Sequence, residues 1–351
     1  MDEIDEGHHV GWSVLVQGSA RGRAGTAAAL SLAALGLLLA GCSAPGTTGQ
    51  AERCPLTDLA PPGGSVPSRP ALAVKVENLP VARPQYGLGD ADVVYEEPVE
   101  GGITRFVVVY QCRDSTRIEP VRSARIVDPD IVRQFGEHPL FAYSGGIDPA
   151  VAAVRSSSLV DVGVGRAPGA YLRDAARPSP HNLATSTRAL YDAASKDPSS
   201  AGPPAPVFGY GPVSSGAAPS ASVHIAYPAS DVTWRWDSGA RAWLRSYSNG
   251  QAAATAEGGQ IAAANVVVMK VEVFPSPYVE DASGVHENLV TLTGSGSAEV
   301  FRDGMAVKGT WSRPSLHENT RYLDGSGQDI ALANGTTWVE LVPTTVPVTP
   351  G

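Results

Sequence analysis

The sequence has few cysteines and lacks the common catalytic and metal-binding signatures. Its three cysteines are Cys42, Cys54 and Cys112, and no Cys or His cluster with zinc-ligand spacing surrounds the last two. It contains no GxSxG elbow, no HExxH pair and no Walker loop, which excludes the enzyme classes that those motifs identify. We therefore expect no metal site and no cofactor.

The chain also lacks a positive charge balance, because its formal net charge is −9. A protein that binds nucleic acid non-specifically needs a basic surface to neutralise phosphates, so no nucleic-acid partner is expected. The chain has 351 residues, of which 43% are hydrophobic and 17% charged, as in a folded globular protein. Its 38 glycines and 29 prolines indicate many turns, and its length suffices for two domains.

The N-terminal stretch "RGRAGTAAALSLAALGLLLAGC" predicts a secretory signal. Arg21 and Arg23 precede an apolar run that ends in small residues directly before Cys42, an arrangement typical of a bacterial lipobox with a lipidated cysteine. The alternative is a transmembrane or buried helix, but the run is shorter than the ~20 residues that a spanning helix needs. We interpret residues 1–41 as the signal peptide region, with a mis-set start codon because acids precede the arginines.

A lipidated Cys42 predicts a cell-membrane protein, lipid-anchored on the extracytoplasmic face, with the membrane as its first partner. Residues 42–70, rich in Pro, Gly, Ser and Thr, are interpreted as a tether that becomes ordered near Cys54. Outside the cytosol thiols tend to be oxidised, so a Cys54–Cys112 disulfide is predicted. Two unpaired thiols are the alternative.

Residues 71–197 mix strand and helix signals. Runs such as "ALAVKVE" and "TRFVVVYQ" have the β-branched and aromatic content of strands. Asp128-Pro129 and Asp148-Pro149 each offer an acid followed by proline at a helix start, and Ser186 or Thr187 could cap a third helix. This part is predicted to be a mixed α/β domain.

The pattern changes after residues 198–222, which are interpreted as a linker or long loop. Residues 223–345 contain short alternating runs separated by turns, which predicts a mostly antiparallel β domain and an α+β protein overall. Trp234, Trp236 and three further tryptophans, Trp243, Trp311 and Trp338, could line a sugar-binding face, but alternate positions in hairpins are more often core.

Several segments together carry a family resemblance. The chain contains, in this order, "AVKVENLPVARPQYGLGDADVVYEEPVEGGITRF", "EPVRSAR", "YSGG", "LRDAARPSPHNLATS", "SAEVFRDGMAVKGTW" and "GTTWVELVP". Over residues 71–343 it resembles the YerB-like bacterial lipoproteins, a family of unknown function with an N-terminal and a C-terminal part. The resemblance implies a lipoprotein and a two-part chain, and it implies no reaction. Glu119 departs from the pattern, where a glycine is expected.

The polar residues of these motifs are the candidate site. Guanidinium groups hold carboxylates or phosphates through planar, paired hydrogen bonds, and the glycines of "YSGGIDPA" could add backbone N–H groups before a helix. The predicted binding residues are Arg83, Glu100, Arg105, Arg122, Arg125, Arg173, Asp174, Arg177, His181 and Asn182. The alternative is that these arginines form structural salt bridges.

Arg122 and Arg125 stand three apart, so on an extended segment their side chains point to opposite sides. We expect the segment to turn, so that at least one of them joins Arg105, Arg173, Glu100 and His181 around a cleft while the other braces a loop. Ser123 has no sequence cue for a neighbouring base and is not expected to be a nucleophile.

Two functions remain open from the sequence. The first is a binding or scaffold protein for an anionic cell-envelope ligand or an envelope protein, acting through the arginine-containing domain. The alternative is a glycan-directed hydrolase or transferase that uses Glu100 and His181 as acid and base, as paired carboxylates and histidines commonly do.

Overall fold

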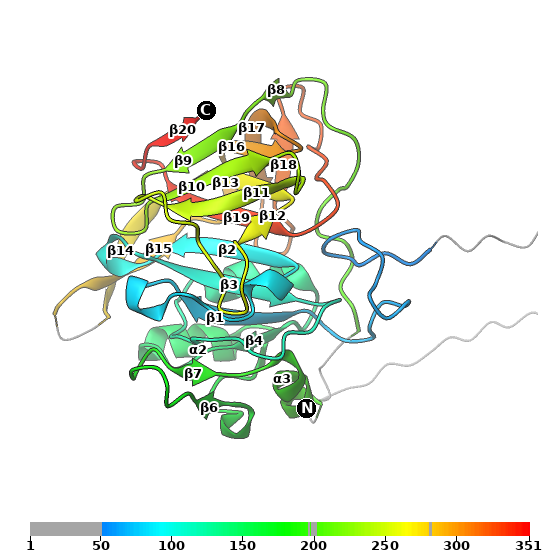
Figure 1. Cartoon of the computed structure of the whole chain (residues 1–351). Helices are drawn as coiled ribbons and strands as arrows, with labels where there is room; N and C mark the ends of the chain where they lie inside the picture. Colours follow the sequence, from blue (N-terminus) through cyan, green and yellow to red (C-terminus); the bar gives the residue numbers. More distant parts are fainter. Residues whose placement is uncertain (1–50, 196, 198–201, 281–282) are drawn as a thin grey trace, which may run out of the picture. The chain divides into compact units, whose positions relative to one another are not determined.

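Both halves of the chain contribute strands to one large mixed sheet (Figure 1). The first half supplies β1 (Leu72–Glu77), β2 (Val93–Pro98), β3 (Thr104–Tyr110), β4 (Leu140–Ala142) and β5 (Val160–Asp161). The second half supplies β8 (Ala218–Pro219), β13 (Asn265–Val271), β16 (Gly294–Arg302), β17 (Met305–Arg313), β18 (Arg321–Asp324) and β19 (Thr337–Pro343). The order is β18-β17-β16-β13-β19-β2-β3-β1-β4-β5, with β8 also beside β17.

The computed structural model describes residues 51–195, 197, 202–280 and 283–351. The predicted signal peptide region, the predicted lipidation site Cys42 and the first part of the predicted tether lie outside the described residues, as do residues 198–201 of the predicted linker. In the described part of the chain, no helix has the length and apolar character needed to cross a membrane.

The two halves meet at β19, which lies between β13 and β2 and runs parallel to both. Residues Gln50–Gly351 accordingly form one compact unit, in which the predicted N-terminal and C-terminal domains share a sheet. The α+β prediction holds in its coarse form, with a mixed N-terminal sheet, few helices and mainly antiparallel pairing in the second half. The parallel pairing of β19 departs from it, because the chain returns to the sheet centre after its hairpins.

A second, antiparallel sheet covers one face of the large sheet (Figure 1). Its strands, in spatial order, are β12 (Ala262–Ala263), β11 (Ala242–Tyr247), β10 (Val232–Asp237), β9 (Ser222–Ile225) and β20 (Val348–Pro350). The ring centroids of Trp234 and Trp338 lie 5.2 Å apart, and those of Trp243 and Phe301 lie 5.5 Å apart. These three tryptophans are fully buried, so they form core and do not offer a sugar-binding face.

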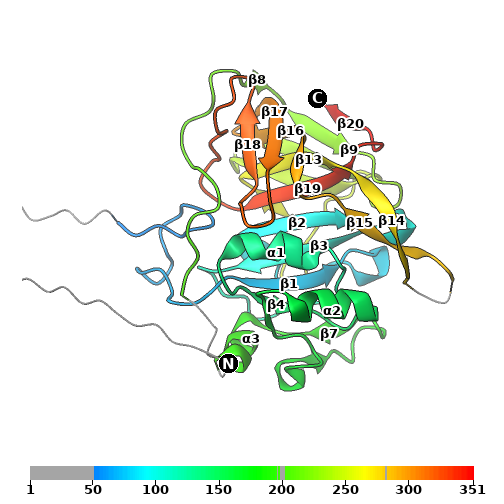
Figure 2. The ribbon, with the colours of Figure 1, turned by 180° about the vertical axis from the view of Figure 1, so that it is seen from behind.

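Short helices cover the other face, where α1 (Asp128–Val132) and α2 (Asp148–Ser156) lie over the sheet (Figure 2). Both have proline in the first turn, as the Asp-Pro pairs predict, but their N-caps are Val127 and Ile147, so neither aspartate caps its helix. A third helix, α3 (Thr187–Ala194), begins after Ser186, whose hydroxyl accepts a hydrogen bond from the Ala189 N–H at 3.2 Å. The remaining elements are β6 (Leu172–Arg173), β7 (Leu183–Ala184), β14 (Val273–Val279), β15 (His286–Val290), η1 (Pro80–Ala82), η2 (Leu88–Asp90), η3 (Glu100–Gly102), η4 (Arg133–Phe135) and η5 (Pro168–Ala170).

The predicted disulfide is present between Cys54 and Cys112, whose Cα atoms are 5.8 Å apart. It links the beginning of the described chain to the residue that follows β3 by two positions. Leu56, two residues after Cys54, is fully buried. The segment from Cys54 onward therefore packs on the body, although it lies within the predicted tether.

We expect Cys54→Ser to lower the free energy of unfolding by about 2–4 kcal/mol, because the disulfide restricts the unfolded chain. The cysteines are 58 residues apart, a long loop to close. Urea unfolding of the variant and of wild type, each with and without a thiol reductant, measures the difference. Reductant should lower the stability of wild type alone; equal stability of both oxidised proteins would contradict the prediction.

Candidate functional site

The site begins with the alternation of side chains along β1. Leu72, Val74 and Val76 point toward the five-stranded sheet, whereas Lys75 and Glu77 point toward α1 and α2. In register with Glu77, the neighbouring strand β3 carries Arg105, and β2 carries Glu97 beyond it. A row of alternating charges therefore crosses the helix-covered face.

Lys75 is fully buried between two carboxylates. Its Nζ contacts Glu97 and lies 2.7 Å from Asp128 Oδ1, and Asp128 Oδ2 accepts a hydrogen bond from the Arg125 backbone N–H at 2.7 Å. Burial raises the pKa of Glu97 to about 8, with the charge of Asp128 acting in the same direction and Lys75 against it. The Lys75 ammonium group is thus shared between two acids, and Glu97 retains its proton near neutral pH.

Arg125 is the centre of a second group of carboxylates. Its guanidinium forms a forked ion pair with Glu100, with Nε 3.0 Å from Oε2, and its Nη2 lies 2.8 Å from Glu280 Oε1. Glu287, on β15, accepts a hydrogen bond from the Ile126 backbone N–H at 2.6 Å. Because the Arg125 side chain is only 1% exposed, it braces η3 and the β14–β15 hairpin against the start of α1.

Arg122 contacts a different carboxylate. Its backbone N–H donates to the Lys75 carbonyl at 2.9 Å, so its segment lies beside β1, and its Nε is 3.2 Å from Glu77 Oε1. His181 Nδ1 lies 2.8 Å from the other oxygen of Glu77. We call Glu77, Arg105, Arg122 and His181 the Glu77 site.

The Glu77 site is partly open to solvent and has unused hydrogen-bonding capacity. The side chains of Arg122 and His181 are 21% and 17% exposed, whereas Glu77 is buried. Glu77 Oε1 and Arg122 Nε face each other at 3.2 Å, whereas the Nε atom of Arg105 is buried without a hydrogen-bond partner among the described residues, which is uncommon in native structures and calls for an explanation such as a ligand or ordered water. Burial, then the charge of Arg125, lowers the pKa of Arg105 to about 10, so an added anion would be stabilised here.

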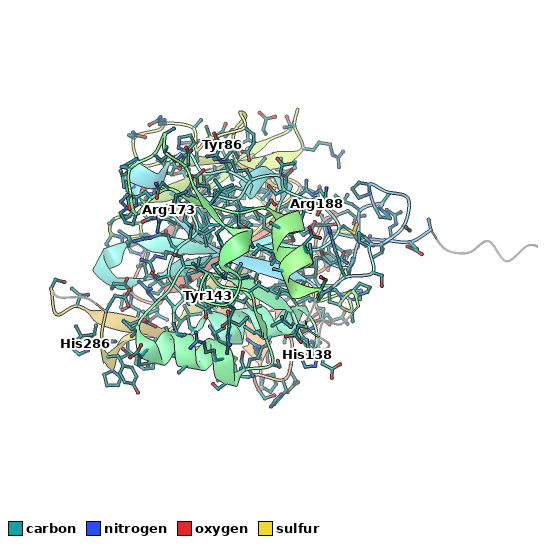
Figure 3. All side chains as sticks on the ribbon, turned by 90° about the horizontal axis from the view of Figure 1, so that it is seen from below. Tyr86, His138, Tyr143, Arg173, Arg188 and His286 are labelled. Atoms are coloured by element: carbon teal, nitrogen blue, oxygen red, sulfur yellow. A yellow bond between two sulfur atoms is a disulfide. The ribbon has the colours of Figure 1, made fainter. Side chains whose placement is uncertain are left out.

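The other predicted residues lie in separate groups. Arg173, labelled in Figure 3, donates to Asn182 at 2.8 Å across the β6–β7 hairpin, and Arg177 donates to the carbonyls of Ala82 and Pro84. Asp174 pairs with Arg117. Arg117 also binds Glu119 at 2.8 Å, so the unexpected acid is neutralised outside the Glu77 site. Arg173 thus does not reach the group that it was expected to join.

The glycines of the 143–146 loop allow close packing beside Arg122 and Arg125. The Ser144 N–H donates to the Arg122 carbonyl, and the Ala124 N–H donates to the Gly145 carbonyl, both at 2.9 Å. A Cβ added at Gly146 would lie 3.1 Å from the Ala124 carbonyl oxygen, with φ at +147°. These contacts hold the two arginines in place.

A second buried network lies on the opposite face of β2. Glu96, which follows Tyr95 on this strand, accepts from Arg245 Nη2 at 2.7 Å and from Asn78 Nδ2 at 3.1 Å. Its register partner on β19 is Glu340, which accepts from Trp234 Nε1 at 2.8 Å. Burial and the charge of Glu96 raise the pKa of Glu340 well above its usual value.

Sequence reasoning missed most partners of these arginines. The carboxylates Glu77, Asp128, Glu280 and Glu287 were not candidate site residues, although Glu77 lies in a quoted family motif and Asp128 in a predicted helix start. Arg125 and Glu280 are brought together by β14 and β15, which lie far along the chain. Only the fold could reveal these pairs. In the described part of the chain, no three His, Cys, Asp or Glu residues form a group that could hold a metal ion.

Comparisons with known proteins agree on one family. Residues 56–200 match the N-terminal domain of DUF3048, described as a protein of unknown function, and residues 223–339 match its C-terminal domain. YerB of Bacillus subtilis (strain 168), described as a candidate lipoprotein, is 28% identical over 309 residues, which cover 84% of this chain and 88% of YerB. The crystal structure of Bacillus subtilis YerB is similar in fold, with a TM-score of 0.73 and 24% identity, over 85% of this chain and 99% of that one.

We expect the free energy of unfolding to fall as the pH rises from about 4.5 to about 8. Burial raises the pKa of Glu97 to about 8 and that of Glu287 to about 7. Each carboxyl therefore binds its proton more tightly in the folded protein than in the unfolded chain, and ionisation at higher pH costs stability.

The test is urea unfolding at several pH values with wild type and Glu97→Gln, which removes one titrating group. The variant should show a smaller loss of stability between about pH 6 and pH 8. Gln at the exposed Glu137 is the matched control and should leave the pH profile unchanged. A wild-type stability that increases across this range would contradict the assignment.

Proposed function

This chain belongs to the DUF3048 family, and from that premise we propose that it is a lipid-anchored, extracytoplasmic protein that binds an acidic cell-envelope ligand at the Glu77 site. The lipid anchor is supported by the lipobox ending at Cys42 and by the description of YerB as a candidate lipoprotein. The disulfide is in keeping with an oxidising compartment.

The binding role rests on one observation: the partly exposed side chains of Arg122 and His181 both contact Glu77, and the buried Nε–H of Arg105, on the strand beside Glu77, has no hydrogen-bond partner among the described residues. A carboxylate or phosphate oxygen accepts from guanidinium N–H groups. Glu77 is buried and contacts both His181 and Arg122, so it fixes the positions of these two side chains. The buried ion pairs of Lys75 and Arg125 fix the backbone next to the Glu77 site. The side chains of Arg122 and His181 therefore need no large movement to contact a ligand.

The ligand is an acidic group on an envelope polymer or on an envelope protein. The side chains of Arg122 and His181 are partly exposed and can reach such a group. Arg125 is buried against Glu100 and Glu280 and cannot. Arg125 accordingly takes the bracing role and Arg122 the binding role.

One contact favours a second candidate, a glycan-directed hydrolase or transferase. A carboxylate at 2.8 Å from Nδ1 orients the His181 ring and leaves Nε2 to accept or donate a proton. The sequence predicted Glu100 as the acid that acts with His181. In the structure the carboxylate that contacts His181 is Glu77, because Glu100 is paired with Arg125. Hydrolysis of envelope glycan that is lost in His181→Gln, with ligand binding retained, would support this candidate.

We expect the wild-type protein to carry a fatty acid and Cys42→Ala to lack it. The sulfur of Cys42 is the acceptor of the lipid in a lipobox. Metabolic labelling with a radioactive fatty acid and separation of membrane and soluble fractions provide the measurement. Cys54 and Cys112 are bound to each other, so residual label on Cys42→Ala would refute the assignment.

We expect Arg125→Met mainly to reduce stability and Arg122→Met mainly to weaken ligand binding. Arg125→Met should lower the free energy of unfolding by about 3–5 kcal/mol, because it leaves buried carboxylates unpaired. Arg122→Met should lower stability by less, about 1 kcal/mol, because Arg122 is partly exposed and Glu77 keeps its contact with His181, and it should weaken binding to purified cell-wall polymer about tenfold or more.

Thermal unfolding and co-sedimentation with the polymer measure the two effects. Arg188→Met is the matched control, because Arg188 lies on α3, is 90% exposed and has Asp192 of the same helix as its ion-pair partner (Figure 3). Unchanged co-sedimentation of Arg122→Met would remove the basis for the binding role.

A further inference from the structure

A separate pocket of about 530 Å³ opens where the segment after β1 meets the end of β11. Its apolar walls include prolines and alanines from both halves of the chain. The polar and aromatic side chains that line it are those of Arg83, Tyr247, Ser248, Asn249 and Gln251. The pocket therefore combines one cation and one aromatic ring with uncharged hydrogen-bonding groups.

Arg83 is held rigidly at this pocket. Its Nε donates to Asn78 Oδ1 at 3.2 Å, its Nη2 donates to the Asn78 carbonyl at 2.7 Å, and its guanidinium carbon lies 4.0 Å from the centre of the Tyr247 ring. Asn78 is in turn held by Glu96 and by Thr104, at 3.1 and 2.8 Å. A fixed guanidinium loses little conformational entropy when it binds a ligand.

Arg83, which is partly buried, also lacks an ion pair within the described part of the chain, whereas Arg125 and Arg245 each have one. Among the described residues, its contacts are with Asn78 and the Tyr247 ring, and no carboxylate lies within ion-pair distance. Arg245, also on β11, lies 5.4 Å from the centre of the same ring, and its own counter-charge is Glu96. Burial lowers the pKa of Arg83 below its usual value and the charge of Arg245 acts in the same direction, whereas Tyr247 and Glu96 act against them. An anion would relieve both effects.

We propose that this pocket is a binding site for a small organic anion, with a carboxylate or phosphate on Arg83 and hydroxyl or amide groups of the ligand against Ser248, Asn249 and Gln251. Nη1 of Arg83 has no hydrogen-bond partner in the part of the chain that the structure describes, and it is the donor that the ligand uses. Apolar contact with the alanines and prolines excludes water from one side of this ion pair.

This site is distinct from the Glu77 site. Glu77 and Asn78 are consecutive at the end of β1, so their side chains point to opposite faces. Glu77 holds His181 and Arg122 on the helix-covered side, whereas Asn78 holds Arg83 on the side of the five-stranded sheet. The pocket takes a free small molecule, and its occupancy does not require a ligand at the Glu77 site.

Calorimetric titration of the full chain in mild detergent tests this site with D-glucuronate, glucose 1-phosphate and D-glucose. At least one of the two anions should bind, and glucose should bind about tenfold or more weakly than that anion, because it lacks the charged group. The two anions separate the sources of charge, a carboxylate or a phosphate. Arg83→Met should lose about tenfold or more in affinity, while Arg188→Met should bind as wild type does.

A second variant covers the case in which Arg83→Met fails to fold. Ala252 is exposed and lines the pocket, so Ala252→Leu should narrow it and cause a similar loss of affinity without unfolding. Anion binding that survives both substitutions, or that is lost only in Arg122→Met, would place the ligand elsewhere and overturn the proposal. Failure of wild type to bind either anion, or equal binding of glucose, would overturn it as well.

Discussion

The burial of two consecutive glutamates on β2 is the constraint on which the architecture depends. Glu96 and Glu97 are both fully buried, and the strand directs them to opposite faces of the sheet. An unpaired carboxylate in such an interior would cost several kcal/mol. Each face must therefore supply a cation or keep the acid protonated. Arg245 pairs with Glu96, whereas Lys75 is shared between Glu97 and Asp128 and leaves the pKa of Glu97 raised to about 8.

These two pairs explain how the halves of the chain are joined. Arg245 comes from β11, so the charge of Glu96 draws the five-stranded sheet onto the large one, and the tryptophans of that interface stack around the same guanidinium. On the opposite face, Asp128 connects Lys75 to the loop of Arg125, which in turn holds the β14–β15 hairpin. The family's N-terminal and C-terminal parts thus form one body.

The number of acids around each arginine distinguishes the arginines that brace the structure from those that we propose bind a ligand. Arg125 has three acids around it and is covered. Arg122 shares Glu77 with His181 and is partly exposed, whereas Arg105 shares Glu100 with Arg125 and keeps a buried Nε–H without a partner among the described residues. Arg83 has no acid, only an amide and a ring. A ligand anion is bound most favourably where the protein has not already supplied the negative charge. We therefore expect ligand binding at the Glu77 site and at Arg83, and not at Arg125.

The sequence by itself determined the features that depend on local chemistry. Strand alternation, the Asp-Pro helix starts, the Ser186 cap and the pairing of the two cysteines that follow the lipobox all follow from short-range preferences or from elimination. Only the tertiary structure decided which arginine met which acid. Glu77 reaches His181 over 104 residues and Arg125 meets Glu280 through a hairpin from the other half, because ion pairing depends on distance in space, which no local pattern specifies.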